Sequence, residues 1–424
     1  MTLTRAAPQG TDGQARDFRI SVAGLQPGMF VSRLDRPWMG TGFPFEGVLL
    51  QTNEDVDQLR RLCVHVHVDP SRGRSPELRF VQFDGAAGAP RAGQAEIDAL
   101  RRTEWTVRSD FGTEVKPAGE ALARLEHDIG GAMSGVREGG VLDTQALASG
   151  VDTMIDSITR NPSALPWVLE LKRKGDYVYQ HALGCSVWAA TFGRHLGLER
   201  DGLRDLALGA LLCDVGKVRL DQALLERRPP LRESDFHALR SHIAESVRIV
   251  GETPGLSAVV LEMVTHHHER HDGSGYPRGL RGTAIPIHAR IAGLIDTYDA
   301  MTSLRPYAPT RSAHEAVMEL YDQRDRLFQA ELVEQFIRTC GIYPTGSLVE
   351  LSDGSIAVVV GVNSLKRLRP RVMLLLGPDK RPLADFRTLD LADARYDGGE
   401  AALAIQASLP PDAYGIDRAS LFLD

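Results

Sequence analysis

The chain has 424 residues, which predicts roughly two to four domains. Its 49 lysines and arginines stand against 56 aspartates and glutamates, and the formal net charge of −7 excludes a globally basic protein that binds DNA. Hydrophobic residues make up 43% of the chain, enough for a buried core. No apolar run approaches the ~18 residues that a membrane-spanning helix needs.

The N-terminus and the cysteines bear on cellular location. Residues 1–17 are polar and predict a disordered lead, without the apolar stretch of a secretory signal. The cysteines lie far apart and form no Cys-x-x-Cys pair, so we expect free thiols in the reducing cytoplasm. The four are Cys63, Cys185, Cys213 and Cys340.

Residues 18–69 predict a small β-rich domain. The segments RISVAGL, GMFVSRL, VLLQT and VHVHVDP alternate apolar and polar residues, as half-buried strands do. Between the last two, NEDVDQLRRLC predicts a short helix with Asn53 as its N-cap. His65 and His67 are two residues apart on a strand and share one face, which favours a polar sheet face over a metal site.

The structure that the sequence predicts changes three times along the rest of the chain. Residues 70–95 lack periodicity and predict a linker or loop, whereas residues 96–165 predict a helical connector. Residues 166–340 carry helix-length apolar stripes, and residues 341–424 return to short strands separated by turn signals. We therefore expect a multidomain protein: an all-α helical domain, preceded by a small α+β domain and followed by a small β module with a tail.

Histidines and carboxylates gather on the helical stripes. Seven of the 13 histidines fall between His237 and His288. Asp214 ends an apolar stripe, where a buried carboxylate needs a partner such as a metal ion or Lys217. Imidazoles and carboxylates on separate helices suit Fe, Mn, Ni or Zn and have the form of a two-metal hydrolytic site. The candidate ligands on these stripes are His181, Asp214, His242, His267, His268 and Asp296.

Two strings resemble a known family. LLCDVGKV and HHHERHDGSGYPRGLRGTAIPIHARIAGLIDTYDAMTSLRPY are similar to the HD-GYP domain, a branch of the helical HD phosphohydrolases that hydrolyse the bacterial messenger cyclic di-GMP. The resemblance covers roughly residues 165–340. The segment ahead of it resembles a small domain of unknown function often found before HD-GYP domains, and residues 343–395 resemble what commonly follows them.

The resemblance implies a site with two divalent metal ions and a substrate pocket. Asp214 matches the aspartate that bridges the ions and is catalytic, and Lys217 matches the lysine that contacts the scissile phosphate. His181 and Asp296 match ligands of the first ion, whereas the positions of His242, His267 and His268 match ligands of the second. The signature Gly275, Tyr276 and Pro277 and the phosphate-binding Arg305 complete the implied substrate site.

One departure affects the expected activity. The family has histidine where this chain has Cys213. A Cys213 thiolate could ligate the first ion, or Cys213 could be a small buried hydrophobe that leaves this ion weakly held. The first outcome predicts a cyclic di-GMP phosphodiesterase that forms linear pGpG or GMP. The second predicts a weak or inactive sensor of cyclic di-GMP or a protein-interaction module.

The resemblance also implies partners. HD-GYP domains contact diguanylate cyclase (GGDEF) proteins through the loop that carries the GYP residues, and a homodimer is expected. Tyr177 stands where a three-metal subgroup has glutamate, so a third ion is not expected here.

Overall fold

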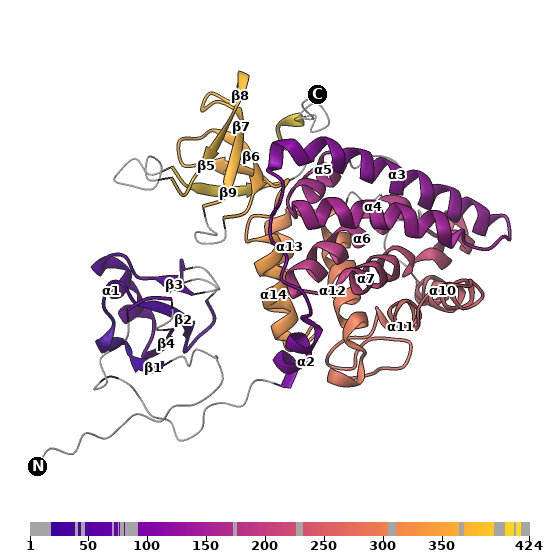
Figure 1. Ribbon diagram of the computed structural model, residues 1–424, viewed down its shortest axis with the longest axis horizontal. Coiled ribbons are helices and arrows are strands. Elements are labelled where there is room, and N and C mark those ends of the chain that lie inside the picture. The colour runs from indigo at the N-terminus through magenta and orange to yellow at the C-terminus, as the bar shows by residue number, and fades with distance from the viewer. Residues whose placement is uncertain are drawn as a thin grey trace, which may run out of the picture. The chain divides into compact units, whose positions relative to one another are not determined.

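The computed structural model shows how the chain folds (Figure 1). It divides into two compact units, Met1–Ala89 and Pro90–Asp424. The residues that the structure describes are 18–38, 41–43, 47–69, 72–74, 76, 80, 92–172, 176–225, 232–303, 311–363, 369–393, 403–410 and 413–416. The predicted disordered lead, residues 1–17, and Arg305 lie outside them.

In its described residues, the first unit has a four-stranded antiparallel sheet and one α-helix, α1. In β4, Val66 and Val68 face the core, and His65 and His67 lie together on the other face. The helix begins one residue earlier than predicted, because Thr52 caps it: its hydroxyl accepts from the Asp55 N–H, and Asp55 accepts from the Thr52 N–H. The strand order is β1-β4-β2-β3, and the elements are β1 (Phe18–Ser21), β2 (Phe30–Leu34), β3 (Val48–Leu49), α1 (Asn53–Leu62) and β4 (His65–Val68).

The second unit begins with the helical domain. Helix α6 is buried along most of its length and packs against α4, α7 and α12, so it forms the centre of the domain. The helices before it are α2 (Ala92–Leu100), α3 (Phe111–Arg137), α4 (Thr144–Arg160) and α5 (Ala164–Lys172). The later ones are α6 (Tyr177–Leu196), α7 (Arg200–Leu212), α8 (Gln222–Leu225), α9 (Glu233–Arg240), α10 (His242–Gly251), α11 (Ala258–His266), α12 (Ile287–Thr302), α13 (Ala313–Asp322) and α14 (Ala330–Cys340).

A five-stranded antiparallel sheet follows the helices, in the order β8-β7-β6-β5-β9. The predicted turn signals lie between its strands: Asp353 and Gly354 join β5 to β6, and Gly354 has the positive φ of +85° that glycine tolerates. The strands are β5 (Leu348–Leu351), β6 (Ile356–Gly361), β7 (Arg371–Leu376), β8 (Pro382–Asp390) and β9 (Ile405–Leu409).

The expected fold class is therefore confirmed. A helical domain is flanked by a small α+β unit and a small β module. Apolar periodicity accounts for both sheets and for the helices, whose buried residues recur on one stripe. Among the residues described, no helix is both long and apolar enough to cross a membrane.

Candidate metal centre

The side chains of the candidate centre come from the ends and faces of different helices. Asp214 follows α7, where the 3₁₀ turn of residues 215–219 carries the chain against α10. This approach requires Gly216: a Cβ there would lie 2.3 Å from the carbonyl oxygen of His242. The Gly216 N–H donates to Ser246 Oγ at 2.8 Å, which holds the turn and thereby Asp214.

A first group surrounds one oxygen of Asp214. His242, His267 and His268 offer nitrogen atoms that, with an oxygen of Asp214, all lie within 4.8 Å of one another. His242 Nε2 is 3.1 Å from Asp214 Oδ1, and His267 Nε2 is 3.8 Å from the same oxygen. All four residues are largely shielded from solvent, and the His267 side chain is fully buried.

The imidazoles of this group are oriented as metal ligands usually are. His242 donates its Nδ1–H to the carbonyl of Leu239 at 2.6 Å, and His267 donates to that of Val264 at 3.0 Å. Each Nε2 therefore presents a lone pair toward Asp214. Within the described chain, Nε2 of both histidines and Oδ1 of Asp214 are buried and have no hydrogen-bond partner. Three buried acceptors that converge in this way fit a cation.

A second group surrounds His181 on α6. Its Nε2 lies 3.0 Å from Asp296 Oδ1 and 3.5 Å from Asp214 Oδ2. The two oxygens of Asp214 thus point to different groups, as a carboxylate shared between two cations requires. Cys185, one helical turn after His181, lies with its sulfur 3.8 Å from the His181 ring nitrogens and belongs to this second group.

Asp299 orients His181. Its Oδ2 accepts from His181 Nδ1 at 2.8 Å and from Ser303 Oγ at 2.9 Å, and the Asp299 side chain is fully buried. A carboxylate on the far nitrogen of a histidine fixes the tautomer and the direction of the ring. The sequence motifs do not mark Asp299 or Cys185 as site residues. Their spacing is the signal for them: Asp299 stands three residues after Asp296, and Cys185 stands four residues after His181.

Cys213 lies in neither group. It caps the C-terminal end of α7, is buried, and interacts with His267. Tyr177 stacks against His181, with the ring centroids 5.4 Å apart and the planes at 11°.

Charge is balanced inside the centre. Lys217 Nζ lies 2.5 Å from Asp214 Oδ2. Burial alone would raise the pKa of Asp214, but the Lys217 ammonium and the surrounding imidazoles hold it well below its usual range. Burial alone would lower the pKa of Lys217. The negative charge of Asp214 outweighs this effect and raises the pKa of Lys217. Burial lowers the pKa of His268 well below normal, which leaves a neutral imidazole.

The loop that carries Gly275, Tyr276 and Pro277 closes over the first group. A Cβ on Gly275 would lie 2.4 Å from the His268 carbonyl oxygen, so only glycine fits there. The Tyr276 ring stacks on His268, with centroids 4.8 Å apart. Buried Glu269 accepts from the N–H groups of Arg278 and Leu280 at 2.8 and 3.0 Å and holds the far side of the loop.

Two arginines near this loop have contacts of different kinds. Arg240 lies 4.6 Å from the centroid of the Tyr276 ring, where its charge faces the loop. Arg270 donates to the carbonyls of His267 and Glu269 at 2.9 and 3.0 Å, so it supports the backbone at the end of α11.

Three families match the chain. Residues 162–332 match an HD domain, residues 18–147 a domain of unknown function (DUF3391), and residues 348–396 a KOW domain associated with the HD domain. The match to the HD domain contains every residue of the two groups described above.

The chain is also similar to curated proteins. Cyclic di-GMP phosphodiesterase PA4108 of Pseudomonas aeruginosa is 30% identical over 379 residues, 89% of each chain. The response regulator RpfG of Xanthomonas campestris, named a cyclic di-GMP phosphodiesterase, is 33% identical over 38% of this chain and 44% of its own. The 3'3'-cGAMP-specific phosphodiesterase 1 of Vibrio cholerae is 34% identical over 34% of this chain and 33% of its own.

The helical fold, the HD-domain match and the buried imidazoles and carboxylates define the chain as a metal-dependent phosphodiesterase of the HD class. With the loop that carries Gly275, Tyr276 and Pro277 and an identity of 30% over 89% of a curated relative, the chain belongs to the HD-GYP family.

Proposed function

We propose that this protein hydrolyses cyclic di-GMP to linear pGpG or GMP at a centre of two divalent metal ions. The observation that carries the proposal is the placement of Asp214, whose two oxygens face two separate groups of buried ligands. The name of the relative that spans 89% of the chain supports the substrate.

The proposed ligands follow the two groups. Asp214, His242, His267 and His268 would hold one ion, whereas His181, Asp296 and the shared Asp214 would hold the other. We assign the sulfur ligand of the second set to Cys185, because Cys185 lies in that group and Cys213 does not. A sulfur ligand favours Fe or Zn over Mn. The ions, when bound, lower the pKa of water toward neutrality and polarise the phosphoryl oxygens.

The remaining residues of the site position the substrate and offset its charge. Lys217, held against Asp214, can donate to a phosphoryl oxygen as negative charge develops on it. Tyr276 and the neighbouring Gly275 and Pro277 form one wall, where the Arg240 charge also attracts a dianionic substrate. We propose that Arg305 adds a second cation for the phosphate.

The test uses the full chain, stripped of metal and reloaded separately with Mn, Fe, Ni and Zn. Bound metal is measured by elemental analysis, and cyclic di-GMP and 3'3'-cGAMP are offered separately and in competition. We expect linear product from cyclic di-GMP, loss of turnover and of bound metal in Asp214→Asn, and no change in the control His237→Gln, an exposed histidine of α9. Turnover that survives Asp214→Asn, or preference for 3'3'-cGAMP, would overturn the proposal.

The second candidate function is recognition without cleavage, and the replacement of the HD histidine by Cys213 favours it. A protein of this kind binds cyclic di-GMP tightly and releases no linear product under any of the four metals. Calorimetry beside the turnover assay separates the two functions.

We propose that the protein acts in the cytoplasm as a homodimer and contacts GGDEF proteins through the loop of residues 274–279. Ser274, Pro277, Arg278 and Gly279 of that loop are exposed, so a partner can reach them. Sedimentation tests the dimer. Binding of a purified diguanylate cyclase, weakened by Arg278→Glu and unchanged by Arg381→Glu on the C-terminal β module, tests the contact.

A further inference from the structure

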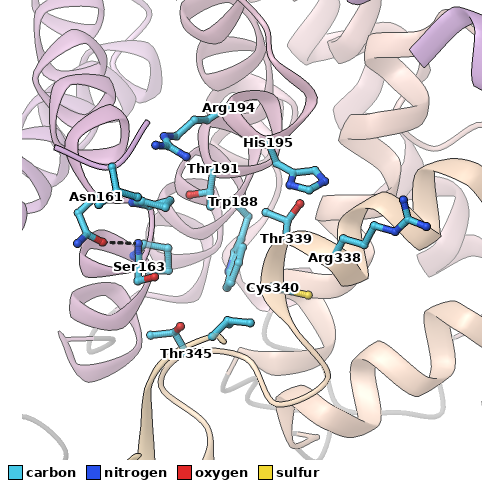
Figure 2. Close-up of a pocket in the computed structure, with 14 residues that line it drawn as sticks. Asn161, Ser163, Trp188, Thr191, Arg194, His195, Arg338, Thr339, Cys340 and Thr345 are labelled. Carbon is cyan, nitrogen blue, oxygen red and sulfur yellow. Dashed lines mark hydrogen bonds between the residues drawn. The ribbon is translucent and has the colours of Figure 1, made fainter. Parts of the chain in front are cut away.

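A cavity lies along the C-terminal half of α6, and none of the residues of the metal centre lines it (Figure 2). Its volume is about 390 Å³, within the range of small-molecule sites. The walls come from α6, from the connection between α4 and α5, from the end of α14, and from the segments that flank β5 and β6. The cavity therefore lies where the helical domain meets its C-terminal β module.

Arg194 brings positive charge to the wall of the cavity. Arg338 also lines the cavity, but Figure 2 shows its guanidinium directed away from Trp188 and Arg194, and none of the described residues that line the cavity carries a carboxylate. Burial lowers the pKa of Arg194, but a guanidinium stays protonated at neutral pH. A cavity of this composition selects an anion.

Two buried N–H donors at the cavity have no acceptor among the described residues. Trp188 is 2% exposed, its ring borders the cavity, and its Nε1–H has no hydrogen-bond partner among the described residues. Arg194 Nε is likewise buried and without a partner in the described chain. The same guanidinium is already held in place, because its Nη2 donates to the carbonyls of Thr106 and Thr159 at 3.2 and 3.4 Å. The remaining donors are thus pre-oriented for a ligand oxygen.

The polar wall opposite α6 is also preformed. Asn161 donates to the Ser109 carbonyl at 3.0 Å and accepts from the Ser163 N–H at 2.9 Å (Figure 2). Pro162 and Pro166 add an apolar surface beside these groups. A ligand with an anionic head and an organic body matches this division.

The aromatic side chains connect the cavity to the metal centre. Trp188 makes an edge-to-face contact with Tyr298, with centroids 5.3 Å apart and planes at 83°. Tyr298 lies on α12 between Asp296, a member of the second group, and Asp299, which orients His181. A ligand that shifts Trp188 therefore acts on the helix that carries Asp296.

We propose that this cavity is an effector site for a small organic anion, which binds by its phosphate or carboxylate to Arg194 and to the Trp188 Nε1–H and changes the metal affinity of the centre. The effector site is separate from the substrate pocket, and binding of the anion to it does not depend on hydrolysis of cyclic di-GMP.

The test titrates the full chain, free of metal, with GMP, citrate and inorganic phosphate in separate calorimetry runs. Trp188→Phe removes the indole donor and keeps an aromatic ring, Arg194→Gln removes the charge, and Arg381→Gln removes an exposed charge elsewhere as the matched control. We expect GMP or citrate to bind, Trp188→Phe and Arg194→Gln to weaken that binding by about tenfold or more, and Arg381→Gln to leave it unchanged. Circular dichroism and thermal melts verify that each variant folds.

Manganese titrations with and without the bound anion test the coupling. We expect the manganese dissociation constant to change by about fivefold or more, and to lose this dependence in Trp188→Phe. The effector site is overturned if neither organic anion binds, or if the folded variants Trp188→Phe and Arg194→Gln bind the anion as tightly as the unchanged chain. It is also overturned if inorganic phosphate binds as tightly as the organic anions, or if the manganese dissociation constant is the same with and without the anion. GMP held at the metal centre instead would be released by Lys217→Gln and not by Trp188→Phe, which also overturns it.

Discussion

Two pairs of histidines in this molecule differ in what their rings face. His65 and His67 lie on the outer face of β4, where Arg19 and Arg33 donate to their Nδ1 atoms at 3.3 and 3.2 Å. The Asp35 carboxylate also lies 3.7 Å from His65 Nδ1, but the His65 side chain is 26% exposed. His267 and His268 lie at the end of α11, where His267 is fully buried beside Asp214.

The difference decides what each pair can bind. A guanidinium beside an imidazole occupies its lone pair and repels a cation, whereas a carboxylate beside an imidazole attracts one. Burial adds to the effect, because charges attract more strongly where water is excluded. A close pair of histidines is therefore a candidate metal site only when acids and burial accompany it.

Exchanging one histidine in each pair gives the largest expected difference. In His267→Gln we expect metal binding and phosphodiesterase turnover to fall by more than about 100-fold, since a proposed ligand is lost. In the matched variant His67→Gln we expect metal content to be unchanged and the free energy of unfolding to move by no more than about 0.5 kcal/mol. Elemental analysis and chemical denaturation measure both variants. Equal metal loss in the two would contradict the comparison.

The effect of a carboxylate on the imidazole that it orients can be tested at Asp299, the partner of His181. Asp299→Asn keeps the shape but weakens the orientation of His181, so we expect metal affinity to fall about 10- to 100-fold. The control Asp201→Asn changes an aspartate that is exposed on α7 and should leave metal affinity as it is. Metal titration followed by calorimetry measures the effect, and an unchanged affinity in Asp299→Asn would show that His181 needs no such partner.

The backbone beside His267 and His268 is also expected to tolerate little change. In Gly275→Ala the added Cβ would meet the His268 carbonyl oxygen, and we expect a loss of about 1–3 kcal/mol in unfolding free energy together with weaker metal binding. Gly131→Ala in α3 meets no atom within 4 Å and should stabilise the protein by about 0.5–1 kcal/mol. Urea denaturation of both variants compares them. A neutral Gly275→Ala would mean that the loop can retreat from His268.

The sulfur atoms around the centre give the smallest expected change. Cys213→His restores the family residue beside His267, and we expect metal occupancy and turnover to rise by a factor below about ten. Cys185→Ser should instead shift the preference among Mn, Fe and Zn away from the softer ions. Elemental analysis after competition among the three metals reads out the second variant. If Cys213→His improves neither occupancy nor rate, this position does not limit the site.

Much of the molecule follows from local sequence. Alternation of apolar residues predicted β4 and placed His65 and His67 on one face, and the Asp-Gly signal lies at the turn between β5 and β6. The motif strings predicted the family and the fold class, because they record which residue types stand at which separations. Local patterns were less exact at helix ends, where Thr52 rather than Asn53 provides the cap.

Only the tertiary structure decided which of these residues meet. His181 and Asp299 are 118 positions apart and lie 2.8 Å apart in space, a contact that depends on how α6 packs against α12. The same packing brings Cys185 into the metal centre, keeps Cys213 beside His267, and leaves the cavity next to Trp188 open. The sequence determines the periodicity and the chemical groups of each helix, but the direction and distance between groups on different helices are set by side-chain packing over the whole core.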